Sequence, residues 1–377
     1  MKTALYQYCN GTFSRHSRSD EMDATQAGLV LCFGAKHLLG TGIYDDLKNR
    51  FSRAGIAICS TAGEIFHTDV CDSTISIAAI QFSDTQIVTR SVSIDHHTDS
   101  YKAGLGLVKQ FPTGLSYLLV LSDGSKVNGS ELVNGLNDGA GGNILVTGGL
   151  AGDGANFQST LIGLNAAPRE GLIAGIGFYG DKIKIHHGSQ GGWEMFGLEK
   201  TVTRSDGNVL YEIEGRNALE LYKKYLGAEA GSLPGSALLF PLSVILPGGA
   251  QVVRTILSID ESAGSMRFAG DIPEGAQVRF MKANFDKITD AASGAALQSL
   301  ARSGQPPGLA LLISCVGRKL ILQSRTDEEV AAVNEIFGGH TLLTGFYSYG
   351  EISPIVSDGD CHLQNQTMTI TTFYETE

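Results

Sequence analysis

The chain has 377 residues, little charge and no long apolar run. Charged residues make up 18%, against roughly 25% in an average domain, and the formal net charge is −11. A nucleic-acid binder needs a basic face, so this balance argues against such a partner. No apolar run approaches the ~20 residues of a membrane span, and the start Met1-Lys-Thr-Ala-Leu-Tyr-Gln-Tyr lacks the apolar core of a signal peptide. We expect a cytoplasmic protein with no membrane partner.

Several motifs of catalytic and metal-binding proteins are also missing. The six cysteines show no CxxC spacing, so we expect reduced thiols. There is no phosphate-binding GxxxxGK[ST], no GxGxxG spacing in 148–154 and no paired-histidine zinc spacing. Cys59 and Cys315 sit at expected strand ends, which leaves a hydrolase or transferase as one alternative. No signature ties either thiol to a histidine base, and buried structural thiols are commoner. We expect no enzyme.

Glycine, in contrast, is abundant, with 48 residues against 9 prolines, and it punctuates a unit that occurs three times. Each unit predicts a buried strand, a helix, a second strand that ends in a short glycine–acid turn, and a last strand. The expected segments are 28–33, 44–51, 56–65 and 74–82 in the first unit, 117–121, 130–136, 144–153 and a strand from 160 in the second, and 308–313, 327–337, 342–352 and 365–373 in the third. The turns should therefore fall at matching strand ends, where a shared pocket is expected.

The length of the chain favours two domains. A helix expected at 217–226 is broken by the glycine-rich stretch 227–235, so we place the boundary there and expect domains 1–227 and 228–377. A β-rich stretch and a helix at 286–302 precede the third unit. The predicted fold class is α/β (α+β), with two pseudo-related domains of mixed β-sheets flanked by helices and built from repeated strand–helix–strand–strand units.

Four glycine–acid turns could carry ligand contacts: Gly63-Glu64, Gly152-Asp153, Gly270-Asp271 and Gly350-Glu351. Two interpretations stay open. The acids line a cleft between the domains, or each acid caps a turn that follows a glycine with positive φ. Arg318 could offer a guanidinium fork to a carboxylate, although an arginine at a strand end is more often a solvated or ion-paired surface residue. The expected ligand-binding residues are Glu64, Asp153, Asp271, Arg318, Tyr349 and Glu351.

A histidine pair lies in the run Asp181-Lys-Ile-Lys-Ile-His-His-Gly-Ser-Gln-Gly-Gly-Trp193. If 182–187 is a strand, alternation puts Ile183, Ile185 and His187 on the inner face. His187, beside a glycine-rich loop and the single tryptophan, could ligate a haem iron or another metal. The alternative is a core histidine held by hydrogen bonds.

Several multi-residue motifs in order resemble the FIST family, the sensory domains of bacterial signal-transduction proteins and some F-box proteins. The resemblance spans nearly the whole chain and rests on the following motifs: Cys59-Ser-Thr-Ala-Gly-Glu-Ile65, Gly148-Gly-Leu-Ala-Gly-Asp153, Gly188-Ser-Gln-Gly-Gly-Trp193, Val202-Thr-Arg-Ser, Gly270-Asp-Ile-Pro-Glu-Gly275, Met281-Lys-Ala-Asn284, Cys315-Val-Gly-Arg318, Gly345-Phe-Tyr-Ser-Tyr-Gly-Glu-Ile352 and Asn365-Gln-Thr-Met-Thr369. It identifies the two predicted domains as a FIST N-type and a FIST C-type module.

The resemblance implies a small-molecule sensor with no established catalytic role. Members with the His-Gly-Ser-x-Gly-Gly-Trp run are similar to haem proteins that sense nitric oxide and regulate a separate histidine kinase. On that basis we expect haem b, with His187 as iron ligand and Ile185, Gly188 and Trp193 beside it. A second copy of the chain, in a homo-oligomer, is a further possible partner. Many relatives have a histidine before Asn-Gln-Thr-Met where this chain has Gln364, so the ligand role could instead fall to His362. The alternative is a haem-free sensor of a small polar metabolite such as an amino acid.

Overall fold

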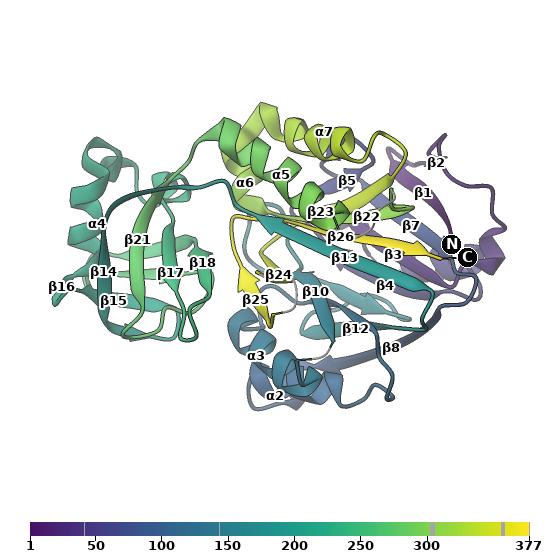
Figure 1. Ribbon diagram of the computed structural model, residues 1–377, viewed down its shortest axis with the longest axis horizontal. Coiled ribbons are helices and arrows are strands. Elements are labelled where there is room, and N and C mark those ends of the chain that lie inside the picture. Colours follow the sequence, from purple (N-terminus) through teal and green to yellow (C-terminus); the bar gives the residue numbers. More distant parts are fainter. Residues whose placement is uncertain (41, 143, 302–305, 356–358, 377) are drawn as a thin grey trace.

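The computed structural model describes residues 1–40, 42–142, 144–301, 306–355 and 359–376. In this part of the chain, three six-stranded sheets form a large body, and one eight-stranded sheet forms a separate lobe (Figure 1). The lobe comprises 194–282 and lies at one end of the molecule, away from both termini. The chain enters it through β14 (Glu194–Asp206) and leaves it after β21 (Gln277–Lys282), and these two strands pair antiparallel.

The first sheet contains the first predicted unit. Its central strand β3 reads Leu-Val-Leu-Cys-Phe-Gly and is buried along its whole length, because helices and other sheets cover both of its faces. β3 pairs parallel with β4 and antiparallel with β7, in the order β11-β4-β3-β7-β1-β2. The strands are β1 (Lys2–Cys9), β2 (Thr12–Arg15), β3 (Leu29–Gly34), β4 (Gly55–Ser60), β7 (Ile75–Gln81) and β11 (Ile162–Leu164).

The second and third sheets repeat this arrangement with the second and third units. The second sheet has the order β25-β24-β10-β9-β12-β8 and the third has the order β13-β26-β22-β23-β5-β6. The second consists of β8 (Gln86–Ser93), β9 (Tyr117–Ser122), β10 (Leu145–Leu150), β12 (Leu172–Tyr179), β24 (Gly350–Pro354) and β25 (Cys361–Gln364). The third consists of β5 (Glu64–Phe66), β6 (Asp69–Cys71), β13 (Ile183–Gln190), β22 (Leu309–Cys315), β23 (Leu342–Ser348) and β26 (Met368–Glu375).

The three units exchange strands in a cycle. The segment that follows the second strand of each unit leaves its own sheet and pairs with another: β5 and β6 of the first unit join the third sheet, β11 of the second unit joins the first, and β24 and β25 of the third unit join the second. Each sheet is therefore completed by a different unit.

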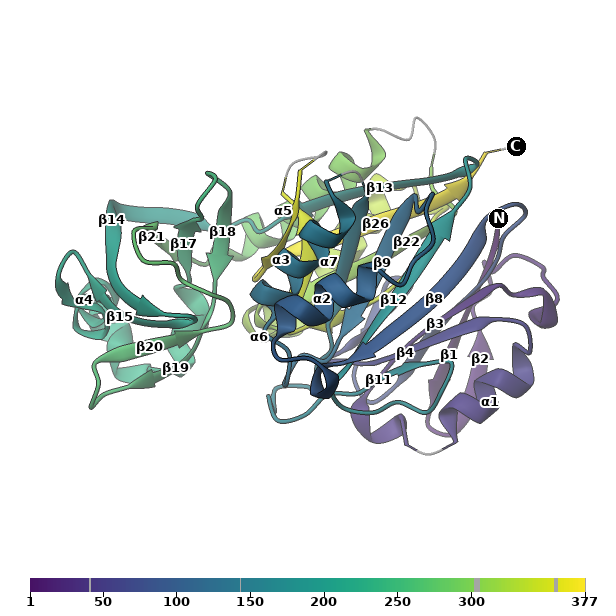
Figure 2. The same cartoon turned by 90° about the horizontal axis from the view of Figure 1, so that it is seen from below.

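Helices cover the outer faces of the sheets (Figure 2). α2 (Ser100–Val108) and α3 (Gly129–Ala140) pack together on the second sheet, and α5 (Phe285–Leu300) and α7 (Thr326–Ile336) pack together on the third. α6 (Val316–Leu322) follows β22 directly. On the first sheet, α1 (Ile43–Arg50) packs on β4. Short 3-10 helices occupy several connections: η1 (Ala24–Gln26), η2 (Lys36–Leu38), η3 (Ile94–His96), η4 (Gly227–Ser232), η5 (Gly235–Leu239) and η6 (Gln323–Arg325).

The lobe has its own apolar core, formed by α4 (Ala218–Leu226) and the inner faces of its strands. Besides β14 and β21, its strands are β15 (Val209–Ile213), β16 (Arg216–Asn217), β17 (Leu242–Ile245), β18 (Gln251–Arg254), β19 (Ile256–Asp260) and β20 (Ser265–Phe268). The boundary expected between 227 and 228 falls inside this lobe, directly after α4.

The predicted mixed α/β fold of repeated strand–helix–strand–strand units is confirmed. Most predicted strands and helices have a counterpart within a few residues. The exception is the last strand of the second unit, expected from 160: that strand is β12, which begins at Leu172, whereas the short β11 near 160 joins the first sheet. Within the described residues, no helix combines the length and the apolar character needed to cross a membrane. All six cysteines are free thiols.

Candidate functional site

The three glycine–acid turns of the repeated units meet at one place in the body. They are held together by backbone hydrogen bonds between every pair of units. The N–H groups of Ala62 and Tyr347 donate to the carbonyls of Tyr347 and Gly63, both at 2.8 Å, that of Gly152 donates to Ser60 at 2.9 Å, and that of Tyr349 donates to Leu150 at 3.2 Å. The three turns predicted at matching strand ends are therefore in contact with one another. We call this meeting point of the turns at 60–64, 150–153 and 347–351 the junction.

Glu64 ties the first turn to the start of the last strand of its unit. Its carboxyl group accepts hydrogen bonds from the Thr61 hydroxyl, from the Thr74 hydroxyl at 2.8 Å and from the Thr74 N–H at 3.1 Å. The residue is 1% exposed. Burial raises the pKa of Glu64 to about 7, although the hydrogen bonds from the two threonines oppose the shift.

Glu351 does the same in the third unit. It accepts hydrogen bonds from the Ser348 hydroxyl at 2.7 Å, from the Thr367 hydroxyl at 2.8 Å and from the Thr367 N–H at 3.2 Å. Burial again raises its pKa to about 7. Gly63 before Glu64 has the positive φ that the capping interpretation requires, whereas Gly350 before Glu351 does not. Both acids hold their turns through hydrogen bonds from a threonine later in the same unit. Of the two, Glu64 also lines a cavity.

Asp153 and Tyr349 connect the second turn to the third. One carboxylate oxygen of Asp153 accepts the N–H groups of Gln158 at 3.2 Å and Ser159 at 3.0 Å, and the Tyr349 hydroxyl donates to the other. That hydroxyl also accepts the N–H of Phe157 at 3.0 Å, and the Tyr349 ring stacks on the Phe157 ring at 4.5 Å. Both predicted residues therefore lie at the junction.

Glu64 and Asp153 face a common cavity of about 490 Å³ beside the junction, a volume within the range of small-ligand sites. The other charged groups of its lining are Lys36, whose ammonium donates to the Ser159 hydroxyl, and Asp72, which forms an ion pair with Lys319. The lining residues are Ala35, Lys36, His37, Thr61, Ala62, Gly63, Glu64, Asp72, Ser73, Asp153, Gly154, Asn156, Gln158 and Leu161. The cavity thus has carboxyl groups from two units and an ammonium group from the first.

Asp271 lies elsewhere, in the lobe. It lines a cleft of about 300 Å³ between lobe and body, together with Tyr349. The side chain of Asn128 donates to its carboxylate at 3.3 Å, and its own N–H donates to the Ser130 hydroxyl at 3.1 Å. The fourth glycine–acid turn is therefore a contact between the lobe and the start of α3.

Arg318 is completely buried in an ion pair with Glu329 at 2.7 Å. Its guanidinium also donates to the carbonyls of Gly191 and Ile288, both at 2.7 Å. A ligand could reach this group only by displacing one of these partners. The structure thus shows the ion-paired arginine that the sequence left open.

The expected cofactor residues do not surround one cavity. His187 is 8% exposed and lies on β13, opposite Thr371 of β26. Ile185 packs on the apolar core on the same strand face, whereas Gly188 faces α5, where an added Cβ would lie 2.1 Å from the Ala295 carbonyl. The indole of Trp193 lies beyond the strand end and packs on a small apolar cluster with Ile288.

The polar groups around this strand are also engaged. Gln364, at the position where the family resemblance led us to expect a histidine, accepts a hydrogen bond from the Ser189 hydroxyl at 2.9 Å and donates one to the Ser353 carbonyl at 3.0 Å. The Trp193 N–H donates to the Gln366 carbonyl at 2.9 Å. Among the described residues around this strand, Gly188 packs closely on α5, and the hydrogen bonds of Gln364 and Trp193 occupy nearby polar groups, so these residues do not fit a haem as they stand. Within the described residues, no group of three or more His, Cys, Asp or Glu side chains is placed to hold a metal.

The two candidate nucleophiles are inert in this setting. Burial raises the pKa of the Cys59 and Cys315 thiols far above the ordinary value, so both stay protonated at neutral pH. His362, the alternative iron ligand, is half-buried on β25, where burial lowers its pKa.

Sequence reasoning missed several polar residues of the cavity, among them Lys36, His37 and Asp72. Lys36 and His37 belong to η2, directly after β3. The available signal was positional, because η2 follows the first strand of its unit at the same strand ends as the glycine–acid turns. Nothing in the residue types of Ala35-Lys-His-Leu38 singles it out.

Two family models match the chain in succession, and their boundary lies inside the lobe. The model of the FIST N domain matches residues 28–216, and that of the FIST C domain matches residues 218–354. The chain belongs to the FIST family. FIST domains are sensory domains of signal transduction that bind small ligands.

Among curated proteins, this FIST chain is similar to the uncharacterized protein MT0656 of Mycobacterium tuberculosis, at 26% identity over 185 residues. It is also similar to the uncharacterized protein Mb0898c of Mycobacterium bovis, at 28% identity over 185 residues. Each match covers 45% of this chain and 46% of the relative, so the chain spans about half the length of the curated relatives it matches.

Proposed function

We propose that this FIST protein is a sensor that binds a small polar metabolite with an ammonium group, such as an amino acid, in the cavity at the junction of the three turns. The observation that carries the proposal is the pair of carboxyl groups, Glu64 and Asp153, that face one cavity from two units. The Asp153 carboxylate attracts an ammonium group. A bound ammonium beside Glu64, whose pKa is about 7, would favour the ionised form of that carboxyl as well. Lys36 lies in the same lining and offers a partner for a ligand carboxylate.

The junction also offers a route for a signal. The Tyr349 hydroxyl donates a hydrogen bond to the Asp153 carboxylate, and Tyr349 also lines the cleft between body and lobe. A ligand that binds the Asp153 carboxylate would therefore alter the hydrogen bond to Tyr349 and, through it, the contact between body and lobe. A sensor works when its ligand binds one conformation of the protein more tightly than another. A histidine kinase in trans and self-association stay predictions for the output.

Thermal unfolding with a panel of amino acids and their decarboxylated amines tests the proposal. A true ligand at 100 times its Kd should raise the midpoint by about 5 °C. Lys36→Met should weaken the amino acid about 10-fold or more, because a charged hydrogen bond is lost, and should leave the matching amine unchanged. Lys48→Met, a nearby lysine outside the cavity, is the control. If no panel member stabilises the protein, the proposal fails.

The haem prediction has a separate readout. Haem-reconstituted protein should be examined for a Soret band and for its shift with nitric oxide, in the parent chain and in His187→Ala. A specific band that disappears in His187→Ala would contradict the metabolite proposal and support the haem sensor. A featureless or unchanged spectrum would leave the metabolite site as the candidate.

A further inference from the structure

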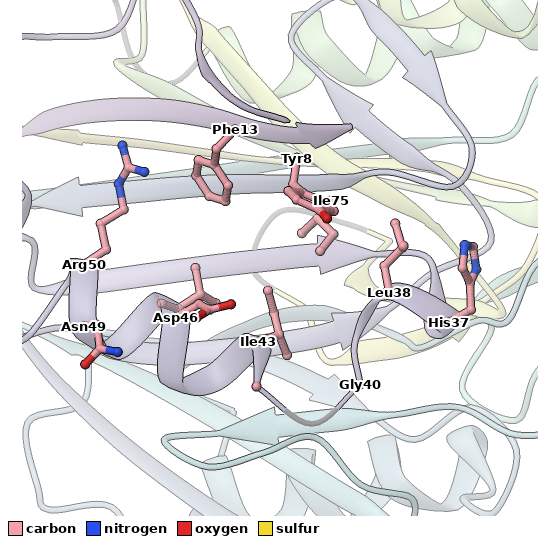
Figure 3. Close-up of a pocket in the computed structure, with 12 residues that line it drawn as sticks. Tyr8, Phe13, His37, Leu38, Gly40, Ile43, Asp46, Asn49, Arg50 and Ile75 are labelled. Carbon is pink, nitrogen blue, oxygen red and sulfur yellow. The ribbon is translucent and has the colours of Figure 1, made fainter. Parts of the chain in front are cut away.

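A second hollow lies on the outer face of the first sheet. It has a volume of about 770 Å³ and runs between α1, η2 and the hairpin of β1 and β2 (Figure 3). Its lining residues are Tyr8, Phe13, His37, Leu38, Gly40, Gly42, Ile43, Asp46, Leu47, Asn49, Arg50 and Ile75. We call it the α1 groove.

The walls of the α1 groove are mainly apolar. Figure 3 shows Phe13 and Tyr8 along one side, Ile43 of α1 along the other and Ile75 between them. Phe13 is 37% exposed and lies with the other apolar residues of this lining; a contiguous apolar surface is more informative than a single exposed side chain. Exposed apolar surface of this kind is commonly covered when a partner binds.

The internal repeat indicates what covers it. In the second sheet the strand β8 is followed by α2, which packs on β8 and β12 beside α3. In the third sheet α5 takes the same place on β13 and β26 beside α7. The corresponding strands of the first sheet are β1 and β7, and the corresponding place beside α1 is the α1 groove, whose floor includes Tyr8 of β1 and Ile75 of β7.

The first unit has no helix for this place in the described chain. β1 is followed by β2 and then by an extended connection to β3, where η1 supplies a single 3-10 turn. Met22 and Ala24 of that connection pack on the same core as Tyr6 and Ile77. The open part of the face therefore has the position of a helix that the other two sheets possess.

We propose that the α1 groove docks an amphipathic helix of a partner protein, which lies beside α1 as α2 lies beside α3. Its apolar stripe would contact Phe13, Ile43 and Ile75. The groove has one acid, Asp46, and one base, Arg50, a helical turn apart on α1. The Arg50 guanidinium stacks 4.8 Å from the Phe13 ring, and among the described residues no carboxylate lies within 4 Å of it, so it offers charge complementarity at its end of the groove. The docked helix should therefore have an acidic residue at the Arg50 end of its stripe.

The groove adjoins the candidate ligand site. His37 lines both cavities, so η2 is a shared wall. If the proposed metabolite site is correct, η2 could report ligand binding to the docked helix. Docking itself is independent of that function and is tested without ligand.

Selection from a displayed library of amphipathic helices, with the parent chain as bait, is the direct experiment. Selected helices should share an apolar stripe with an acid at one flank, and Phe13→Asp should weaken them about 10-fold or more, because it places a charge under the stripe. The matched control is Leu198→Asp, at an apolar residue of the lobe that is 76% exposed. Unfolding midpoints of both variants show whether the fold is kept.

Charge exchange makes the test specific. Arg50→Glu should weaken the acidic helices, and helices with lysine in place of the acid should regain affinity for that variant, a rescue that a misfolded variant cannot show. The proposal is overturned if no helix is enriched, or if enriched helices bind Phe13→Asp as tightly as the parent. It is also overturned if the protein self-associates and Phe13→Asp abolishes this, since a second copy would then be the occupant.

Discussion

Two carboxyl groups in this molecule keep their protons in a pH range where ordinary carboxyls have lost them. Glu64 and Glu351 each sit in a buried turn with hydroxyl and N–H donors aimed at them. Burial dominates, and the pKa of each is about 7. Titration of Glu64 therefore couples the electrostatics of the cavity to physiological pH.

The pH dependence of stability follows from these values. A native pKa above the ordinary carboxyl value means that the folded chain holds a proton that the unfolded chain has released, so stability falls as pH rises from about 4.5 to 7 and then levels off. Relative to Glu64→Gln, the parent chain should lose up to about 3 kcal/mol between pH 5 and pH 8. Urea unfolding at several pH values measures this. If the free energies of unfolding of parent and variant change with pH in parallel, the raised pKa of Glu64 is refuted. Glu351→Gln should remove a pH dependence of the same sign and size.

At the same scale, the sequence was a partial guide to the site. It indicated Glu64, Asp153 and Tyr349 because glycine–acid turns recur at strand ends, and the structure brings these residues together. It could not separate them from Arg318, since burial and pairing with Glu329 depend on how α6 and α7 pack. Residue types alone do not reveal such tertiary contacts.

At the scale of elements, periodicity was sufficient for the long strands and helices. The buried run of β3 and the i to i+4 pattern of α1 lie within one residue of the predicted 28–33 and 44–51. The sequence did not predict that the short strands β5, β11 and β24 pair in the sheet of another unit. A segment of three to five residues does not indicate which strand it will pair with. α2 was missed because its sequence Ser-Tyr-Lys-Ala-Gly-Leu-Gly-Leu-Val contains two glycines, which disfavour an isolated helix.

One of these glycines, Gly104, has a packing role that it shares with Gly135 of α3, and this gives a prediction. α2 and α3 approach so closely that a Cβ on Gly135 would lie 2.0 Å from the Tyr101 carbonyl, and one on Gly104 would lie 2.4 Å from the Leu132 carbonyl. Gly135→Ala should therefore destabilise the fold by about 2 kcal/mol or more, although alanine is the better helix former by about 1 kcal/mol. Gly106→Ala, which meets the movable His97 ring at 3.1 Å, is the control and should be neutral or stabilising. The midpoints of thermal unfolding of the two variants test this prediction. If Gly135→Ala and Gly106→Ala change the midpoint equally, α2 and α3 can move apart at no cost in stability.

At the scale of the molecule, the three-unit body should not fold in pieces. A fragment of residues 1–227 lacks β22, β23 and β26, so β5 and β13 have no sheet to join and β10 loses β24. We expect this fragment to aggregate or remain unfolded by circular dichroism and size-exclusion chromatography. Co-expression with 228–377 should restore the fold.

Removal of the lobe provides the matched control. Glu194 pairs with Lys282, so the two ends of the lobe are adjacent, and a short linker from 193 to 283 should leave the body folded with cooperative unfolding. A monomeric 1–227 fragment that unfolds cooperatively near the midpoint of the full chain would contradict the interdependence of the units.

The cyclic exchange of strands bears on how such a protein can be made and altered. On the ribosome, β10 cannot pair with β24 until residues 350–354 have been synthesised, some two hundred positions later. A nascent chain therefore has unpaired sheet edges for most of its synthesis. The same interlock restrains evolution: a gene that gains or loses a single repeat would leave one sheet with a missing border. The lobe, inserted between β13 and α5, lends no strand to the three sheets of the body and could change without opening them.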